Sequence, residues 1–361
     1  SHNNNHSKTL YIEEGDIKIV KARLNNVKQM NILYKFVVSI FISGIFKKVY
    51  KEYFSNIDFD LILYATPPVT YCSLIKYVKE RTGCKSYLML KDIYPQSIVD
   101  LKYLSKWNPV YLYMKYQETR IYQVSDRIGC MSNANIQYLI DRYKHIDHDK
   151  IGLFPNALDA SFKSKEIPIS ILRQKYNLPD DKTVFVYGGT LGRAQGIPFL
   201  LDCLDRVKSN SRAFFVIVGA GTFFNKIDAF VKMNSMNNVR VIRRMEKDDF
   251  HQLVTACDVG LIFLDHRFTI PNFPSRLLSY MKSGLPVLAC TDEVSDIKDV
   301  IRKGDYGWWI KSDEPDEFSK IIDVILESDY VGKGQIAYNS FVRDFNIKEN
   351  YNTIMAAMIN C

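Results

Sequence analysis

The chain has 361 residues, of which 47% are hydrophobic and 24% are charged. This is the composition of an ordinary globular protein, and the length suits two domains of about 150–200 residues each. Seven cysteines are scattered without a C-x-x-C pair, which argues against a disulfide framework or a zinc site and predicts buried thiols in a reducing compartment. The longest uncharged apolar run, 36–46, is too short for a membrane-spanning helix, which needs about 20 residues. We therefore expect a cytoplasmic protein, or one bound at the inner face of the plasma membrane.

The net charge of +8 is unevenly distributed. Residues 1–160 hold 22 Lys and Arg against 15 Asp and Glu, whereas the remainder is close to neutral. A basic first half predicts an anionic partner for that half. Because no helix-turn-helix, zinc-finger or RNP-like signature is present, we expect a membrane surface and no nucleic acid.

Short β-branched runs alternate with helical stretches along the chain, which predicts parallel sheets covered by helices on both faces. The strands expected in the first half are 17–21, 61–64, 86–90, 127–131 and 151–154. Those expected in the second half are 184–187, 214–218, 239–242, 259–264, 286–289 and 308–310. Helices are expected between them, for example at 198–208, 247–256 and 316–327.

A strand end at Pro155-Asn156, followed by a polar stretch, marks a domain boundary. We predict a first domain over 1–159 and a second over 160–344, with a helical C-terminal stretch, 345–361, that packs back on the first. The first domain opens with a polar tail where a strand, a glycine turn and a helix are usual. We therefore expect it to lack N-terminal elements, about 50 residues by the size of a βαβ unit.

The turn after the strand 184–187 is rich in glycine and begins with Gly188 and Gly189. Glycine lets the backbone approach a phosphate closely, and the helix that follows offers unpaired N–H groups. Arg193 adds a positive charge to this turn. The next strand also ends in a glycine turn, at Gly219. Taken alone, either turn also fits a simple tight connection between strand and helix.

A third segment, 271–287, combines a proline-containing loop with a helix that we expect from Ser275, its predicted N-cap. Arg276 lies in the first turn of this helix, where the dipole disfavours a cation. A charge placed against the local preference indicates a role in ligand binding.

In this order the three segments resemble the donor domain of bacterial family 4 glycosyltransferases, the GT-B enzymes that build capsules, O-antigens and exopolysaccharides. Further matches are Pro67-Pro68, Lys91-Asp92, Pro155-Asn156 and 257–261. The resemblance implies an α/β protein of two doubly wound, Rossmann-like domains facing across a cleft. It also implies a retaining transfer from a nucleotide sugar, UDP-linked in our prediction, without a metal or other cofactor. A lipid-linked saccharide is the expected acceptor.

Carried over residue by residue, the resemblance makes Arg193 and Arg276 the cations that stabilise the departing diphosphate. It also predicts a set of donor-binding positions: Gly188, Gly189, Thr190, Gln195, Gly219, Phe273, Ser275 and Ser279. Lys91 and Asp92 directly follow a strand, where ligand crevices form in α/β domains. We count them as catalytic candidates that contact the acceptor or the donor sugar.

The chain departs from the family pattern at four positions. Two glutamates of the family fall on Pro271 and Ser279, and the second of them usually holds the nucleotide ribose. The turn arginine and lysine of the family fall on Thr190 and Gln195. Two other functions therefore stay open: a non-catalytic partner subunit with a transferase fold, and a sugar-nucleotide epimerase of the same fold.

Two D-x-D sequences, 58–60 and 147–149, fit solvated turns better than metal sites. Two other stretches, 34–53 and 101–116, interleave aromatic residues with lysine. Amphipathic helices of this kind can lie in a lipid interface, although an aromatic core face with a solvated lysine face gives the same pattern.

Overall fold

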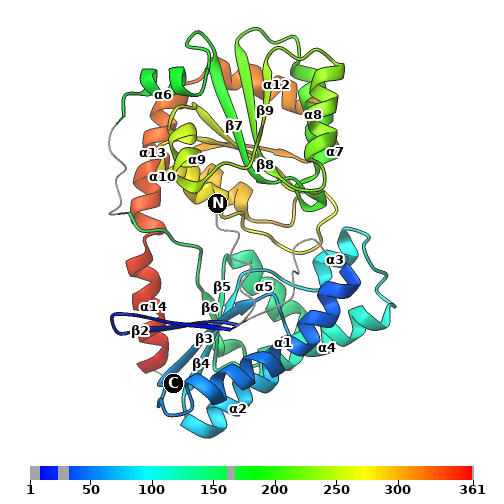
Figure 1. The fold of residues 1–361 in the computed structure, drawn as a ribbon. Coiled ribbons are helices and arrows are strands. Elements are labelled where there is room, and N and C mark those ends of the chain that lie inside the picture. Colours follow the sequence, from blue (N-terminus) through cyan, green and yellow to red (C-terminus); the bar gives the residue numbers. More distant parts are fainter. Residues whose placement is uncertain (1–8, 23–31, 161–166, 360–361) are drawn as a thin grey trace. The chain divides into compact units, whose positions relative to one another are not determined.

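The protein is described by a computed structural model that covers residues 9–22, 32–160 and 167–359. The described residues form two compact units (Figure 1). The first unit takes in those within 1–130, 139–153 and 357–361, and the second those within 131–138 and 154–356. The long continuous part of the second unit begins at Phe154, ahead of the predicted boundary after residue 159. It also holds most of the stretch 345–361, which the sequence predicts to pack on the first domain.

The first unit contains a four-stranded parallel sheet in the order β3-β4-β5-β6. Its strands are β3 (Leu61–Thr66), β4 (Lys85–Leu90), β5 (Arg127–Cys130) and β6 (Ile151–Leu153). The helices in this part of the chain are α1 (Ile32–Tyr53), α2 (Cys72–Thr82), α3 (Gln96–Asp100), α4 (Pro109–Val124), α5 (Asn133–Arg142) and the 3-10 turn η2 (His148–Lys150).

The predicted strand at 17–21 exists as β2 (Ile17–Lys21), but it is not part of the parallel sheet. It pairs antiparallel with β1 (Leu10–Glu14) in a separate hairpin, with a register that pairs Leu10 with Lys21. The expectation that it forms an internal strand of the first domain is therefore wrong. Alternating residues show that a segment is extended, but they do not show which strand it pairs with.

Two aromatic residues of α1, Phe46 and Tyr50, pack against other aromatic side chains of the first unit, whereas Phe41 is exposed. Tyr50 is buried, with its ring 6.0 Å from that of Tyr77 and 6.3 Å from that of Phe59. Phe46 meets the edge of Tyr71 at 5.9 Å. The stretch 34–53 thus uses these side chains in the core of the first unit, which is the alternative that the sequence left open. None of the helices in the described part of the chain combines the length and the hydropathy needed to cross a bilayer.

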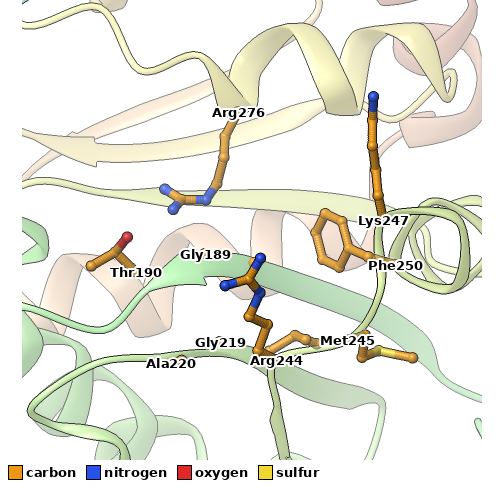
Figure 2. Close-up of a pocket in the computed structure, with 11 residues that line it drawn as sticks. Gly189, Thr190, Gly219, Ala220, Arg244, Met245, Lys247, Phe250 and Arg276 are labelled. Carbon is orange, nitrogen blue, oxygen red and sulfur yellow. The ribbon is translucent and has the colours of Figure 1, made fainter. Parts of the chain in front are cut away.

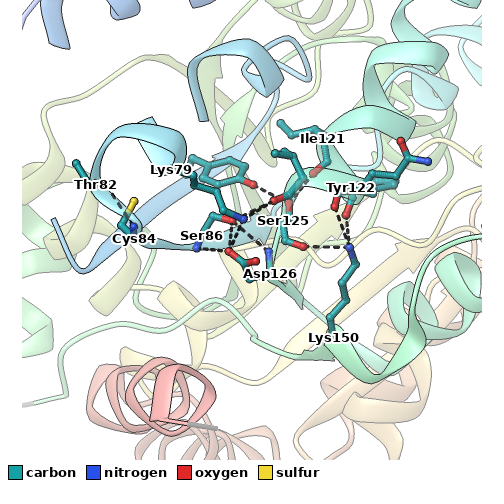
Figure 3. Close-up of polar contacts among 12 residues, drawn as sticks. Lys79, Thr82, Cys84, Ser86, Ile121, Tyr122, Ser125, Asp126 and Lys150 are labelled. Atoms are coloured by element: carbon teal, nitrogen blue, oxygen red, sulfur yellow. Dashed lines mark hydrogen bonds and ion pairs between the residues drawn. The ribbon is translucent and has the colours of Figure 1, made fainter. Parts of the chain in front are cut away.

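A polar network joins the amino ends of β4 and β5 to α2 (Figure 3). The Oδ2 atom of Asp126 accepts hydrogen bonds from the Ser86 amide and hydroxyl, both at 2.8 Å, and pairs with the Lys79 ammonium at 2.6 Å. Burial disfavours the charged carboxylate, but the hydrogen bonds from Lys79 and Ser86 outweigh it and hold the pKa of Asp126 below its ordinary value. The network therefore stabilises the edge of the sheet opposite to the one where ligands bind.

The second unit contains a six-stranded parallel sheet in the order β12-β11-β10-β7-β8-β9. Its strands are β7 (Thr183–Thr190), β8 (Ala213–Ala220), β9 (Val239–Arg243), β10 (Val259–Phe263), β11 (Val287–Thr291) and β12 (Gly307–Lys311). Its helices are α6 (Ile169–Lys175), the 3-10 turn η3 (Arg193–Gln195), α7 (Ile197–Val207), α8 (Phe224–Met233), α9 (Lys247–Thr255), α10 (Arg276–Lys282), α11 (Ile297–Gly304), α12 (Pro315–Leu326), α13 (Tyr330–Asp344) and α14 (Ile347–Ile359).

Both faces of this sheet are buried, which is why its strands read as continuous apolar runs. On β7, Val184 and Val186 belong to one core with residues of α9 and α10. Phe185 and Tyr187 point into a second core with residues of α7 and α12. The doubly wound architecture predicted for this half is therefore confirmed. The six cysteines in the described part of the chain are free and buried, as predicted.

The strand order reverses between β7 and β10, and these two strands pair over a short distance only. Their register comprises two pairs, Val259 with Phe185 and Gly260 with Val186. Beyond these two pairs, the side chain of Tyr280 on α10 connects the two strands. Its hydroxyl accepts a hydrogen bond from the Gly188 amide at 3.1 Å and donates one to the Leu261 carbonyl at 3.2 Å. In doubly wound sheets, ligands bind at such a switch point, outside the carboxyl ends of the strands.

Replacing Asp126 by alanine is expected to destabilise the sheet of the first unit by about 1–3 kcal/mol, because the Lys79 ammonium and the Ser86 amide lose their acceptor. Hydrogen exchange read by mass spectrometry at pH 7 should show faster exchange in β4 and β5, with β7 and β8 unchanged. Since the pKa of Asp126 is depressed, its contribution is present above the ordinary aspartate pKa of about 3.9 and is lost as the pH falls through the lower, folded-state value.

The matched control is Glu80→Ala, which removes a carboxylate from α2, at the residue next to Lys79. Glu80 pairs with Lys76 at 3.9 Å, and both side chains are about two-thirds exposed. Such a pair contributes about 0–1 kcal/mol. If β4 and β5 are equally protected against hydrogen exchange in Asp126→Ala and Glu80→Ala, the network does not stabilise the sheet.

Candidate functional site

A cavity of about 390 Å³ opens at the carboxyl ends of β7, β8 and β9 in the second unit. Its wall consists of the two glycine turns, the segment after β9 and the first residues of α9 and α10: Gly188, Gly189, Thr190, Val218, Gly219, Ala220, Arg244, Met245, Lys247, Phe250 and Arg276. The volume lies in the range of small-molecule sites. We refer to it as the glycine-turn cavity.

The glycine positions of this cavity have no space for a side chain. A Cβ atom at Gly189 would lie 1.4 Å from the Nη2 atom of Arg276, and one at Gly188 would lie 2.1 Å from the Phe250 ring. A Cβ at Gly219 would lie 1.9 Å from the Gly189 carbonyl oxygen. Gly189 also has φ at +138°, a conformation that side-chain-bearing residues rarely adopt. The glycines thus allow a guanidinium to lie directly against the backbone.

Arg276 is held in this position from two sides. Its guanidinium carbon lies 5.0 Å from the centre of the Tyr187 ring, a cation–π distance. Arg276 and Tyr280 are four residues apart on α10 and so share a face of the helix. Because Tyr280 is fully buried and hydrogen-bonded to β7 and β10, its position fixes the direction in which Arg276 points.

A second arginine faces the same space. Arg244 follows β9, and in Figure 2 its guanidinium and that of Arg276 point toward each other over the glycine turn. No Asp or Glu is among the residues that line the cavity, and neither arginine forms a salt bridge with any described residue. Two cations that line one cavity without a carboxylate repel each other, so the cavity is electrostatically suited to an anion.

Lys247 and Phe250, in the first turn of α9, separate this cavity from a neighbouring one of about 430 Å³. The wall of the second cavity is Leu158, Asp159, Lys247, Asp248, Phe250, His251, Val254, Ser279 and Lys282. Burial, together with the nearby Lys282, lowers the pKa of His251, so its imidazole is neutral at pH 7. We refer to this space as the α9–α10 cavity.

The structure brings together five of the residues predicted from the sequence. Gly188, Gly189, Thr190, Gly219 and Arg276 all line the glycine-turn cavity. Arg244, Met245, Lys247 and Phe250 line it as well, and the sequence analysis did not name them. Arg244 could have been found, because two arginines directly follow the predicted strand 239–242, which neighbours the glycine-turn strands in the sheet.

Other predicted residues lie elsewhere. Phe273 is buried in the core, with its ring 6.2 Å from that of Phe345, so its aromatic side chain serves packing. Ser275 is the N-cap residue of α10, as predicted, but its side chain makes no capping hydrogen bond. Arg193 and Gln195 lie in η3, outside the lining of the glycine-turn cavity, and Arg193 is exposed. Ser279 lines the α9–α10 cavity instead.

Lys91 and Asp92 belong to the first unit, where they follow β4 at the carboxyl edge of its sheet. The Thr66 hydroxyl, at the end of β3, donates a hydrogen bond to the Asp92 carbonyl oxygen at 3.1 Å. Burial lowers the pKa of the Lys91 ammonium. A catalytic role for this pair stays a prediction. Among the described residues, no three His, Cys, Asp or Glu side chains form a group that could hold a metal ion.

The chain is similar in sequence to known glycosyltransferases. The family described as Glycosyl transferases group 1 matches residues 168–339. A probable glycosyltransferase of Pseudomonas aeruginosa, WbjE, is 24% identical over 280 residues, which cover 77% of this chain and 68% of that protein. The putative colanic acid biosynthesis glycosyl transferase WcaI of Escherichia coli is 20% identical over 60% of this chain, and the match spans about half (54%) of that protein.

Among solved structures, the Anabaena protein HepE in complex with UDP superposes with a TM-score of 0.69, covering 89% of this chain and 82% of that one at 16% identity. At this identity the likeness concerns the fold, which is that of a GT-B protein with two Rossmann-like domains. Residues 168–339, which match the family described as Glycosyl transferases group 1, hold all the strands and the glycine-turn cavity of the second unit.

Proposed function

We propose that the protein is a retaining glycosyltransferase that moves a sugar from a UDP-sugar to a lipid-linked saccharide in the synthesis of a surface polysaccharide. The observation that carries the proposal is the pair of arginines over the glycine turn, in a cavity without a carboxylate. The complex of HepE with UDP and the name of WcaI support the choice of donor and pathway. Retention, the lipid-linked acceptor and the location at the membrane rest on the family resemblance and the basic first half of the chain.

In this proposal the diphosphate lies in the glycine-turn cavity. The amides of the glycine turns donate to its oxygens, and Arg276 and Arg244 neutralise its charge. When the bond between the anomeric carbon and the phosphate oxygen breaks, negative charge grows on the departing UDP. Fixed cations that already face that position stabilise the transition state more than the ground state.

The nucleoside is proposed to extend toward the α9–α10 cavity, which adjoins the first one at Lys247 and Phe250. Ser279 lies in that second cavity, at the position where the family usually holds the ribose with a glutamate. A serine hydroxyl can accept or donate one hydrogen bond to a ribose hydroxyl, which is a weaker contact than a carboxylate makes. We therefore expect the phosphate contacts to supply most of the affinity for UDP.

Arg276→Ala and Arg244→Ala are each expected to weaken UDP binding by about 10–100-fold, because each removes a charge-assisted hydrogen bond of about 1.5–3 kcal/mol. Isothermal titration calorimetry with UDP measures the change. Arg193→Ala is the matched control, since it removes the same charge from an exposed position of the neighbouring turn. Unchanged UDP affinity in both Arg276→Ala and Arg244→Ala would remove the basis of the proposal.

Gly189→Ala should lower UDP affinity by roughly tenfold or more, because the new methyl group occupies the place of the Arg276 guanidinium and displaces the charge. Gly284→Ala is the control for backbone strain alone. Gly284 also has a positive φ, at +72°, but a Cβ there meets nothing within 4 Å. Calorimetry and thermal unfolding of both variants separate the two effects. If Gly189→Ala binds UDP as the wild type does, the guanidinium is not held where the structure places it.

A panel of UDP-sugars, supplied with an extract of bacterial lipid-linked saccharides, tests the activity itself. We expect UDP release with at least one donor only when the extract is present, and no loss of activity on addition of a chelator, because the arginines supply the positive charge. Nuclear magnetic resonance of the product gives the anomeric configuration. Activity that a chelator abolishes and manganese restores contradicts metal independence. Conversion of a donor without acceptor indicates an epimerase, and UDP binding without any turnover indicates a non-catalytic subunit.

A further inference from the structure

The outer face of α4 and the residue two positions before it carry large apolar side chains in contact with solvent. Trp107 is 76% exposed, Tyr116 is 59% exposed and Leu112 is 50% exposed. The opposite face of the helix is well packed, with Tyr111, Met114, Ile121 and Tyr122 buried. The core of the first unit therefore does not need the exposed residues, and an exposed apolar surface of this kind marks an interaction site.

These side chains form a continuous strip. Asn108 is the N-cap of α4, since its Oδ1 atom accepts a hydrogen bond from the Val110 amide at 2.9 Å. Trp107 and Leu112 thus occupy the positions that lie against each other at the start of a helix. Leu112 and Tyr116 are four residues apart and share a face.

A cation lies at each end of the strip. The Lys106 ammonium is 5.3 Å from the centre of the Trp107 ring, and the Arg120 guanidinium is 5.5 Å from that of Tyr116. Lys106, Trp107, Leu112, Tyr116 and Arg120 are called the Trp107 strip below. The segment 101–125 holds a single acidic residue, Glu118. Glu118 is fully buried and hydrogen-bonded to Lys115, Tyr122 and Tyr143, so it does not offset the positive charge of the surface.

From this arrangement we infer that the Trp107 strip is the surface by which the first unit binds anionic phospholipid headgroups. Tryptophan and tyrosine favour the membrane interface, where one side of the ring is apolar and the other is wet. Cations beside them pair with the headgroup phosphates, and the segment 101–125 has no exposed carboxylate to oppose this attraction. The inference rests on the proposed function in one respect: a lipid-linked acceptor gives the enzyme a reason to bind there.

Protein-free vesicles test the inference directly. The full chain is mixed with vesicles of phosphatidylcholine alone, or with about a third phosphatidylglycerol, and binding is read by co-sedimentation. We expect binding to the anionic vesicles and little to the neutral ones. The tryptophan emission should shift to the blue, and brominated phospholipids should quench it. In Trp107→Phe the quenching should be lost, because Trp308 and Trp309, the other two tryptophans, lie in β12 of the second unit.

Charge-reversal variants provide a second test of the inference. Lys106→Glu combined with Arg120→Glu should weaken binding to anionic vesicles by at least about tenfold, since each basic residue near the surface contributes to the attraction. Lys303→Glu with Lys348→Glu is the matched control, because both lysines are exposed in the second unit and the change in net charge is the same. UDP affinity, measured on the same variants, should be unchanged, so failure of lipid binding and failure of the proposed donor site are distinguishable.

Three results would overturn the inference. Equal binding to neutral and anionic vesicles removes the electrostatic argument, and equal quenching in Trp107→Phe shows that another surface enters the lipid. If the emission of Trp107 shifts with native membranes but not with protein-free vesicles, the strip binds a protein partner instead of lipid.

Discussion

The glycine-turn cavity depends on one contact, in which the hydroxyl of Tyr280 bridges β7 and β10. These strands separate after two residue pairs, and the gap would leave a buried amide on Gly188 and a buried carbonyl on Leu261 without partners. The tyrosine satisfies both, and its ring occupies the place that a Cβ at Gly260 would need, 2.4 Å away. Since unsatisfied buried polar groups cost about 1–3 kcal/mol each, this arrangement holds α10 against the sheet at the switch point. Arg276 lies one helical turn before Tyr280 and is thereby held over Gly189.

This constraint bears on the two glutamates of the family that the resemblance places at Pro271 and Ser279. The phosphate site that we propose consists of backbone and cations, so it does not depend on those carboxylates. Arg244 and Arg276 come from opposite sides of the strand-order reversal, one after β9 and the other in the helix after β10. In the doubly wound sheet both line the same cavity, although 31 residues lie between them in the sequence. In the first unit, cations lie beside the exposed aromatic side chains of the Trp107 strip.

The sequence predicted the positions of the strands well because β-branched and aromatic runs stand out from the polar turns, most clearly in the six-stranded sheet, whose two faces are both buried. Pairing was harder to predict. Ile17–Lys21 has the composition of a strand, but its partner in the hairpin, Leu10–Glu14, alternates too weakly to be recognised. Phe273 shows a second limit. The family resemblance makes it a donor-binding candidate, whereas its burial against Phe345 depends on a segment about 70 residues away along the chain. Arg244 was not predicted because it follows the neighbouring strand β9 and lies outside the glycine turns that carry the family resemblance.

The most direct test of the account is a structure of the full chain in complex with UDP. The account predicts the β-phosphate in the glycine-turn cavity, within hydrogen-bond distance of the Gly189 backbone and of the guanidinium groups of Arg276 and Arg244, with the ribose directed toward Ser279. A UDP molecule with its phosphates bound elsewhere, at Arg193 or at Lys91 in the first unit, and with the glycine-turn cavity free of ligand, would contradict it.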